Sequence, residues 1–142
     1  MQTKFKKLTP DLMVENVADS VVFYVTKLGF ELDMAVPENE ESIEKELSPN
    51  KKYVYAMIHN DEVFIMFMQK DVYIQDLPVL KNYQIGASAS FYIDVDNLEK
   101  FYNKIKNKVE VIKELFTTWY GMTEFYIKDN NGYILGFAER KK

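Results

Sequence analysis

The chain of 142 residues contains no cysteine and only one histidine, His59. The absence of cysteine excludes a thiolate nucleophile, a redox disulfide and any zinc or iron–sulfur site built on cysteine. Any metal or acid–base chemistry therefore depends on carboxylates, tyrosines or this one imidazole ring.

Long apolar runs and an excess of positive charge are also lacking. The longest apolar runs, such as residues 63–68, are strand-sized and fall far short of the ~20 residues that span a membrane. With 18 basic and 22 acidic residues, the net charge is -4, which disfavours a nucleic-acid surface. No signal peptide is visible at the basic N-terminus. We therefore expect a cytoplasmic protein whose partners include neither nucleic acid nor membrane.

Apolar and aromatic residues are abundant. They make up 47% of the chain, which includes 10 Tyr, 10 Phe and 1 Trp. This content is sufficient for a hydrophobic core, and the length predicts one domain over residues 1–142.

The first half alternates strand and helix patterns. Asn16 begins a helical pattern that Gly29 ends. Apolar segments predict strands over residues 8–14, 30–36, 53–58 and 63–68. The last two strands flank a predicted turn at residues 59–61, which contains His59. The Glu-rich stretch 37–50 is predicted to be a short surface helix or a mobile excursion.

The same order returns after a connector over residues 71–86. Strands are predicted over residues 88–95, 109–115, 121–127 and 133–138, and Asn97 is placed to cap a helix between the first two. The turn between the last two strands contains Asn130 and Gly132. Each half therefore has the order β-α-β-β-β.

The repeat is also visible in the letters. A shift of 81 residues places residues 14–17 (VENV) on residues 95–98 (VDNL). A shift of 70 places residues 53–70 on residues 123–140 and matches Phe67 with Phe137. The change of offset indicates an insertion in the first half, where the Glu-rich stretch lies.

Two segments resemble a known family. Residues 12–32 (LMVENVADSVVFYVTKLGFEL) are similar to the strand, the "S..FY" helix and the "LGF" turn of the vicinal-oxygen-chelate superfamily. Residues 120–139 (YGMTEFYIKDNNGYILGFAE) are similar to its terminal "G.reF...DP.GY...f.e" pattern. This superfamily comprises glyoxalases, bleomycin-resistance proteins and extradiol dioxygenases. Asn130 stands where the family usually has proline, and asparagine also suits a turn.

The resemblance implies an α+β fold of two tandem βαβββ modules that form curved half-barrel sheets around a cup. The modules are expected at about residues 5–70 and 87–142. The resemblance also implies a homodimer in which the cups are shared between subunits.

Metal-dependent members of this family place four ligands in the cup. The matching positions here are Thr9, Met66, Ser90 and Gly136. Two hydroxyls, a thioether and a glycine cannot hold a divalent ion. The resemblance therefore implies the bleomycin-resistance-like branch without a metal or other cofactor, and it disfavours metal-dependent glyoxalase or dioxygenase activity.

The family pattern and the two-residue period of strands together predict an aromatic and acidic cup. Trp119 is expected to contact the ligand or a dimer partner, and Glu124 to face the ligand or to pair with a lysine at the dimer interface. Met66 and its strand neighbours are expected to line the cup or to be packed core. The predicted ligand-binding residues are Asp11, Met66, Ser90, Tyr92, Trp119, Glu124 and Tyr126.

Such a cup suits a flat, apolar ligand that carries positive charge, through stacking, cation–π contact and charge-assisted hydrogen bonds. We therefore expect a non-catalytic, metal-independent binding protein for an unknown small molecule. The alternative is a metal-independent enzyme of isomerase or lyase type, in which Glu124 is the base and Tyr126 or Tyr92 donates a proton.

Overall fold

The computed structural model describes residues 1–141. In chain order, its elements are β1 (Asp11–Val14), α1 (Val17–Leu28), β2 (Glu31–Pro37), β3 (Tyr53–Asn60), β4 (Val63–Gln69), α2 (Lys70–Asp76), the 3-10 helix η1 (Pro78–Asn82), β5 (Ser90–Asp94), α3 (Leu98–Ile105), β6 (Glu110–Thr117), β7 (Met122–Lys128) and β8 (Ile134–Arg140). Among residues 1–141, no helix has the length and apolar content needed to cross a bilayer.

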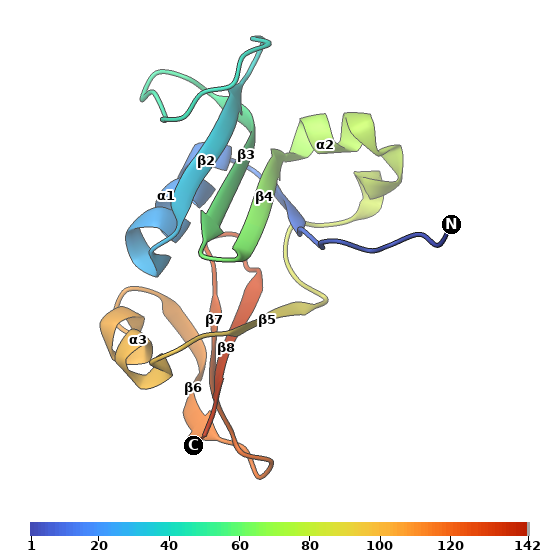
Figure 1. The fold of residues 1–142 in the computed structure, drawn as a ribbon. Coiled ribbons are helices and arrows are strands. Elements are labelled where there is room, and N and C mark those ends of the chain that lie inside the picture. The colour runs from blue at the N-terminus through green and yellow to red at the C-terminus, as the bar shows by residue number, and fades with distance from the viewer. Residues whose placement is uncertain (142) are drawn as a thin grey trace.

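The strands form two sheets of four, with the orders β1-β4-β3-β2 and β5-β8-β7-β6 (Figure 1). In both sheets the first strand runs parallel to the last, and the other neighbours are antiparallel. The shared topology confirms the predicted α+β fold of two tandem βαβββ modules. We call the β1–β4 sheet sheet one and the β5–β8 sheet sheet two.

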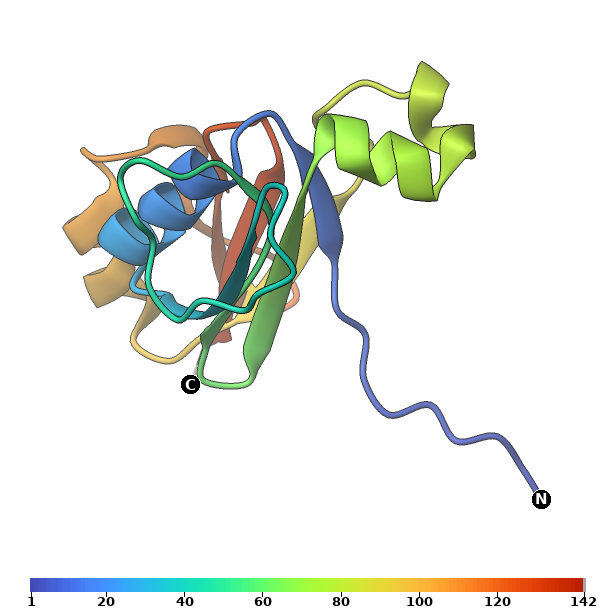
Figure 2. The same cartoon turned by 90° about the horizontal axis from the view of Figure 1, so that it is seen from above.

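Two of the helices cover one side of the two sheets. α1 and α3 lie on this side, whereas α2 and the N-terminal segment lie on the opposite side (Figures 1 and 2). We call the face of each sheet turned away from α1 or α3 its open face.

Burial follows the sequence periods. On α1, the buried residues include Val17, Val21, Tyr24 and Leu28, which share one helical face. Strand residues alternate between the core and the open face, so buried Phe67 has half-exposed neighbours on either side along β4. Both modules contribute to one core.

A buried hydrogen-bond cluster joins the modules where the β7–β8 turn packs on α1. The Tyr24 hydroxyl donates to the Asp129 carboxylate at 2.6 Å, and the Tyr133 hydroxyl donates to the Met13 carbonyl at 2.7 Å. Burial raises the pKa of Asp129, although its hydrogen bonds oppose this. These contacts fix the second module against the first.

The structure excludes the short surface helix, one of the two alternatives expected for the Glu-rich stretch. Residues 38–52 contain no helix. Instead, Glu44 forms an isolated antiparallel bridge with Ala35 of β2, and its carboxylate accepts a hydrogen bond from the Tyr53 hydroxyl at 2.7 Å. Backbone pairing with the edge of sheet one thus takes the place of the surface helix, which was one of the two predicted alternatives.

Two further details differ from the sequence prediction. The connector 71–86 contains most of α2 and all of η1, and the Gln69 side chain caps α2 by accepting the Asp71 amide at 2.9 Å. Asn97 has the left-handed φ of 57° and makes no side-chain cap for α3. Glu139 of β8 replaces it, because its carboxylate accepts the amides of Asn97 and Leu98 at 3.0 and 3.1 Å.

His59 is not in a turn. β3 extends through Asn60, which pairs with Val63 of β4, so the turn lies at Asp61 and Glu62. His59 is therefore a strand residue, opposite Phe64 on the open face of sheet one.

Candidate functional site

Two tyrosines flank a glycine on the open face of sheet two. Tyr92 of β5 and Tyr126 of β7 both pair with Gly136 of β8, so the three form one row across the sheet. The Tyr126 ring leans over the glycine, because a Cβ atom at Gly136 would lie 2.5 Å from its Cε2 atom. The ring therefore occupies the space into which any larger side chain at position 136 would project.

Glu124 is a buried carboxylate beside this row. Its residue exposure is only 4%, and its carboxylate accepts a hydrogen bond from the Tyr92 hydroxyl. Within residues 1–141 it forms no ion pair. Desolvation, followed by this hydrogen bond and the charge of Glu124, raises the pKa of Tyr92. Tyr92 therefore stays protonated and remains a hydrogen-bond donor at neutral pH.

Two more aromatic side chains, Trp119 and Tyr120, adjoin Tyr92 and Tyr126, and we call these four residues the aromatic wall. Trp119 and Tyr120 lie in the β6–β7 hairpin, with ring centroids 5.3 Å apart in an edge-to-face arrangement. Desolvation, followed by Glu124, raises the pKa of Tyr92 and of Tyr126, and the neighbouring Tyr120 hydroxyl adds to the increase at both. Trp119 is 94% exposed, so it is free to contact a ligand or a second protein.

The adjacent edge of the same face already holds a cation. Phe116 of β6 pairs with Glu124, and the Lys113 ammonium lies 4.1 Å from the Phe116 ring centroid. This is a cation–π contact next to the buried carboxylate. The wall thus combines negative charge with aromatic faces, the two features that attract an organic cation.

The family's metal positions do not form a metal site here. Thr9 precedes β1, Met66 offers a thioether, and Gly136 lies beneath the Tyr126 ring. Within the described residues, no group of three or more His, Cys, Asp or Glu side chains could hold a metal ion. The donor set at these positions therefore does not fit a divalent ion.

The open face of sheet one is rich in methionine. Met34, Met57 and Met66 form one row across β2, β3 and β4, and Asp11 of β1 continues it. Burial, followed by the charge of Asp76, raises the pKa of Asp11 to about 6. Methionine side chains are flexible and adapt to ligands of different shape.

His59 lies on the same methionine-rich face, between two carboxylates. Its Nδ1 atom is 2.7 Å from Asp33 and its Nε2 atom 3.3 Å from Glu31. The ring stacks on Phe64, with centroids 5.4 Å apart. Tyr55, Met57 and His59 are alternate residues of β3. The two-residue period of a strand could therefore have placed His59 on this face, but His59 was instead predicted to lie in a turn.

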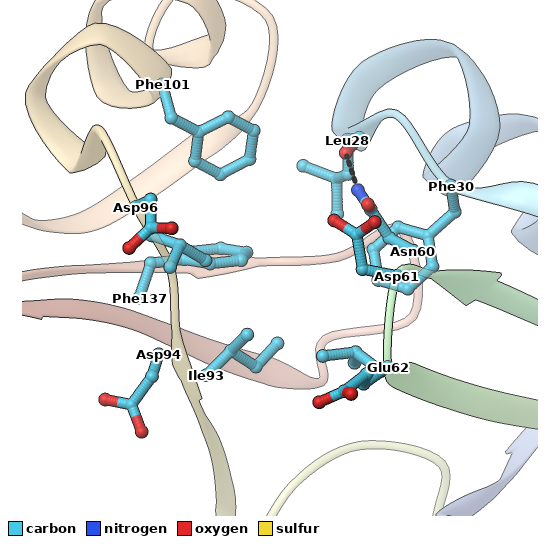
Figure 3. A pocket seen from close by; sticks show the side chains of 12 residues that line it. Leu28, Phe30, Asn60, Asp61, Glu62, Ile93, Asp94, Asp96, Phe101 and Phe137 are labelled. Carbon is cyan, nitrogen blue, oxygen red and sulfur yellow. Dashed lines mark hydrogen bonds between the residues drawn. The ribbon is translucent and has the colours of Figure 1, made fainter.

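Two cavities lie away from the aromatic wall. One, of about 440 Å³, lies beneath the connector, where the Tyr73 hydroxyl donates to the Asp11 carbonyl at 3.0 Å. The other, of about 710 Å³, lies between the modules, near the C-terminus of α1 and the N-terminus of α3 (Figure 3). Its walls carry Asp61 and Glu62 on one side and Asp96 on the other.

The predicted site residues thus fall into two groups. Tyr92, Trp119, Glu124 and Tyr126 belong to sheet two and its hairpin, and Ser90 lies two residues before Tyr92 on β5. The second group, Asp11 and Met66, pairs across β1 and β4 of sheet one. Within residues 1–141, no hydrogen bond joins the two groups. Tyr120, Tyr55, Asp33 and His59 were absent from the prediction.

Comparison with known proteins agrees with this architecture. The model of the Glyoxalase/Bleomycin resistance protein/Dioxygenase superfamily matches residues 6–137. The chain therefore belongs to this superfamily, as the sequence resemblance predicted. No curated protein matches the sequence.

Solved structures share the fold at low sequence identity. A protein of unknown function from Agrobacterium tumefaciens has a TM-score of 0.71 and 15% identity, covering 97% of this chain and 96% of its own. TioX from Micromonospora sp. ML1 has a TM-score of 0.67 and 10% identity, covering 96% and 99%. The bleomycin-binding protein of Streptomyces verticillus, complexed with copper(II)-bleomycin, has a TM-score of 0.61 and 16% identity, covering 96% and 97%.

Proposed function

We propose that this protein is a non-catalytic, metal-independent binding protein for a small aromatic or cationic molecule. The ligand lies on the open face of sheet two, against Tyr92, Tyr126 and the Trp119–Tyr120 hairpin, with its positive charge toward Glu124. The observation that carries the proposal is the burial of Glu124 among aromatic side chains without a cationic partner in the described chain. A buried carboxylate is stabilised by an opposite charge, and the ligand supplies it.

The proposal includes a cytoplasmic homodimer. Sheet one of a second copy, with Asp11, Met66 and the methionine row, faces the aromatic wall and completes the cup. Exposed side chains on the sheet-two side of this cup support the pairing, since Tyr92 is 47% and Trp119 94% exposed. Light scattering coupled to size-exclusion chromatography is expected to give twice the 16.8 kDa chain mass.

Benzyltrimethylammonium is a suitable probe, because it carries a permanent charge next to a ring. Its neutral analogue, neopentylbenzene, has the same shape without the charge. We expect the cation to raise the melting temperature and the neutral analogue to have a much smaller effect, because only the cation interacts with Glu124 and with the ring faces.

Two substitutions test the site, and one serves as a matched control. Glu124→Gln is expected to weaken binding about tenfold, because it removes the Coulombic attraction between the carboxylate and the quaternary ammonium. Trp119→Ala is expected to weaken it about fivefold through loss of cation–π contact. Glu46→Gln, at an exposed position in the Glu-rich loop, is expected to leave it unchanged. If binding occurs but survives both site substitutions, the proposed site is wrong.

A second candidate function rests on the Tyr92–Glu124 hydrogen bond. A carboxylate beside a protonated tyrosine is a base paired with an acid, which suits a metal-independent isomerase or lyase. In that case Glu124→Gln removes turnover of a substrate while its affinity is retained. If the protein only sequesters its ligand, Glu124→Gln instead lowers the affinity, and neither the original protein nor the variant shows turnover.

A further inference from the structure

The cavity between the modules is lined by both apolar and negatively charged side chains. Its volume is about 710 Å³, in the range of small-molecule sites. Phe101 and Phe137 contribute aromatic surface and Ile93 aliphatic surface (Figure 3). Four of the lining residues are Asp or Glu, and none is Lys, Arg or His.

The carboxylates of this cavity are unpaired. Asp61, Glu62 and Asp96 make no ion pair with any residue of the described range 1–141. Asp94 also borders the cavity, but it lies in the row of Ala138 and Glu124 on the open face of sheet two. Figure 3 shows Asp96 on the wall formed by the chain between β5 and α3, and Asp61 and Glu62 on the opposite wall at the β3–β4 turn. Negative charge therefore faces the cavity from two sides, with apolar surface between.

The internal repeat creates two related junctions between the modules: α1 meets the β7–β8 turn at one, and α3 meets the β3–β4 turn at the other. The cavity lies at the second junction. At the other junction, the β7–β8 turn is bound to α1 through the hydrogen bond from Tyr24 to Asp129. The 81-residue shift places Ile105 of α3 at the position of Tyr24, and Ile105 has no hydroxyl to donate. The β3–β4 turn is therefore not drawn onto α3, and the cavity remains between them.

We propose that this cavity binds an elongated organic dication, two ammonium groups joined by an apolar chain. Each ammonium pairs with one acidic wall, and the chain lies on Phe137, Ile93 and Phe101. A single charge would leave the opposite wall unpaired. A metal ion is a poor alternative, because the carboxylates lie on opposite walls and no metal-holding group of His, Cys, Asp or Glu occurs in residues 1–141.

The test uses three linear compounds of equal length: 1,8-diaminooctane, 1-aminooctane and 1,8-octanediol. In titration calorimetry at low salt, we expect the diamine to bind about fivefold more tightly than the monoamine, the contribution of one further exposed ion pair. The diol is expected not to bind measurably, and the affinity of the diamine is expected to fall as salt is added. Equal affinities of diamine and monoamine would overturn the proposal.

Substitutions on the two walls locate the site. The double substitution Asp61→Asn/Glu62→Gln on one wall and Asp96→Asn on the other, all at exposed positions, are each expected to remove the preference for the diamine. Glu41→Gln, an exposed carboxylate in the Glu-rich loop, is the matched control and is expected to leave the preference intact. Glu124→Gln must also leave it intact, because that residue belongs to the open face of sheet two. A preference that survives both wall substitutions, or that Glu124→Gln removes, would refute this assignment.

Discussion

Gly136 offers a direct test of the packing on the open face of sheet two. A Cβ atom at this position would lie 2.5, 2.9 and 3.0 Å from three carbon atoms of the Tyr126 ring. The substitution Gly136→Ala therefore forces the ring to move. Its backbone is not in the left-handed region that would strain an alanine, so the ring alone resists the change.

The expected magnitude follows from two opposing terms. Overpacking of this kind costs about 1–3 kcal/mol. Alanine in a strand is favoured over glycine by about 0.5–1 kcal/mol, because the unfolded chain loses freedom. We expect Gly136→Ala to destabilise the protein in the presence of Tyr126. In a Tyr126→Ala background the clash is absent, and the same substitution is expected to stabilise the protein slightly.

Urea unfolding of the four proteins in this double-mutant cycle measures the coupling. We expect a coupling free energy of about 1–3 kcal/mol, equal to the overpacking term. An effect of Gly136→Ala that is the same in both backgrounds would show that the Tyr126 ring does not occupy this space. The family's last ligand position would then be open and not filled by the Tyr126 ring.

Three further predictions concern stability. Tyr24→Phe removes the hydrogen bond to buried Asp129 and is expected to lower the free energy of unfolding in urea by about 1–3 kcal/mol. An unchanged free energy of unfolding would contradict this prediction. The pKa of Asp11 is raised to about 6 in the folded protein, so its contribution is unfavourable above pH 6 and disappears as the pH falls toward 4. Asp11→Asn should therefore stabilise the protein by about 1–2 kcal/mol at pH 8 and hardly at pH 4, whereas a pH-independent effect would exclude the raised pKa. Glu139→Ala removes the cap of α3 and is expected to lower stability by about 1 kcal/mol, seen as earlier amide exchange in α3.

The start and end of a helix were predictable where neighbouring residues along the chain determine them. The α1 helix begins after Asn16, whose side chain accepts the Asp19 amide at 2.9 Å, and it ends at Gly29 in the left-handed conformation. These were the residues that the sequence indicated as start and stop. The repeat was predictable because the order of strands and helix recurs in both halves, with an offset of 81 residues at the start of the helix and of 70 over the last two strands.

Elements that depend on distant partners were not predictable. Residues 38–52 are held by the bridge from Glu44 to Ala35, and the α3 cap comes from Glu139, about 40 residues away along the chain. The extension of β3 through His59 likewise requires the pairing of Asn60 with Val63. In each case a backbone or side-chain group is satisfied by a partner that no local pattern specifies.

The sequence by itself determined the two-module α+β fold, the family and the unsuitability of Thr9, Met66, Ser90 and Gly136 as metal ligands, because residue types and periods suffice for each. Tertiary structure alone decided that Tyr126 covers Gly136, that Tyr92 donates to Glu124 and that Tyr120 lies near both tyrosines. It also decided that one module junction is closed by Tyr24 and the other left open. These outcomes depend on the strand register and on how two modules pack, and register is set by burial over the whole sheet.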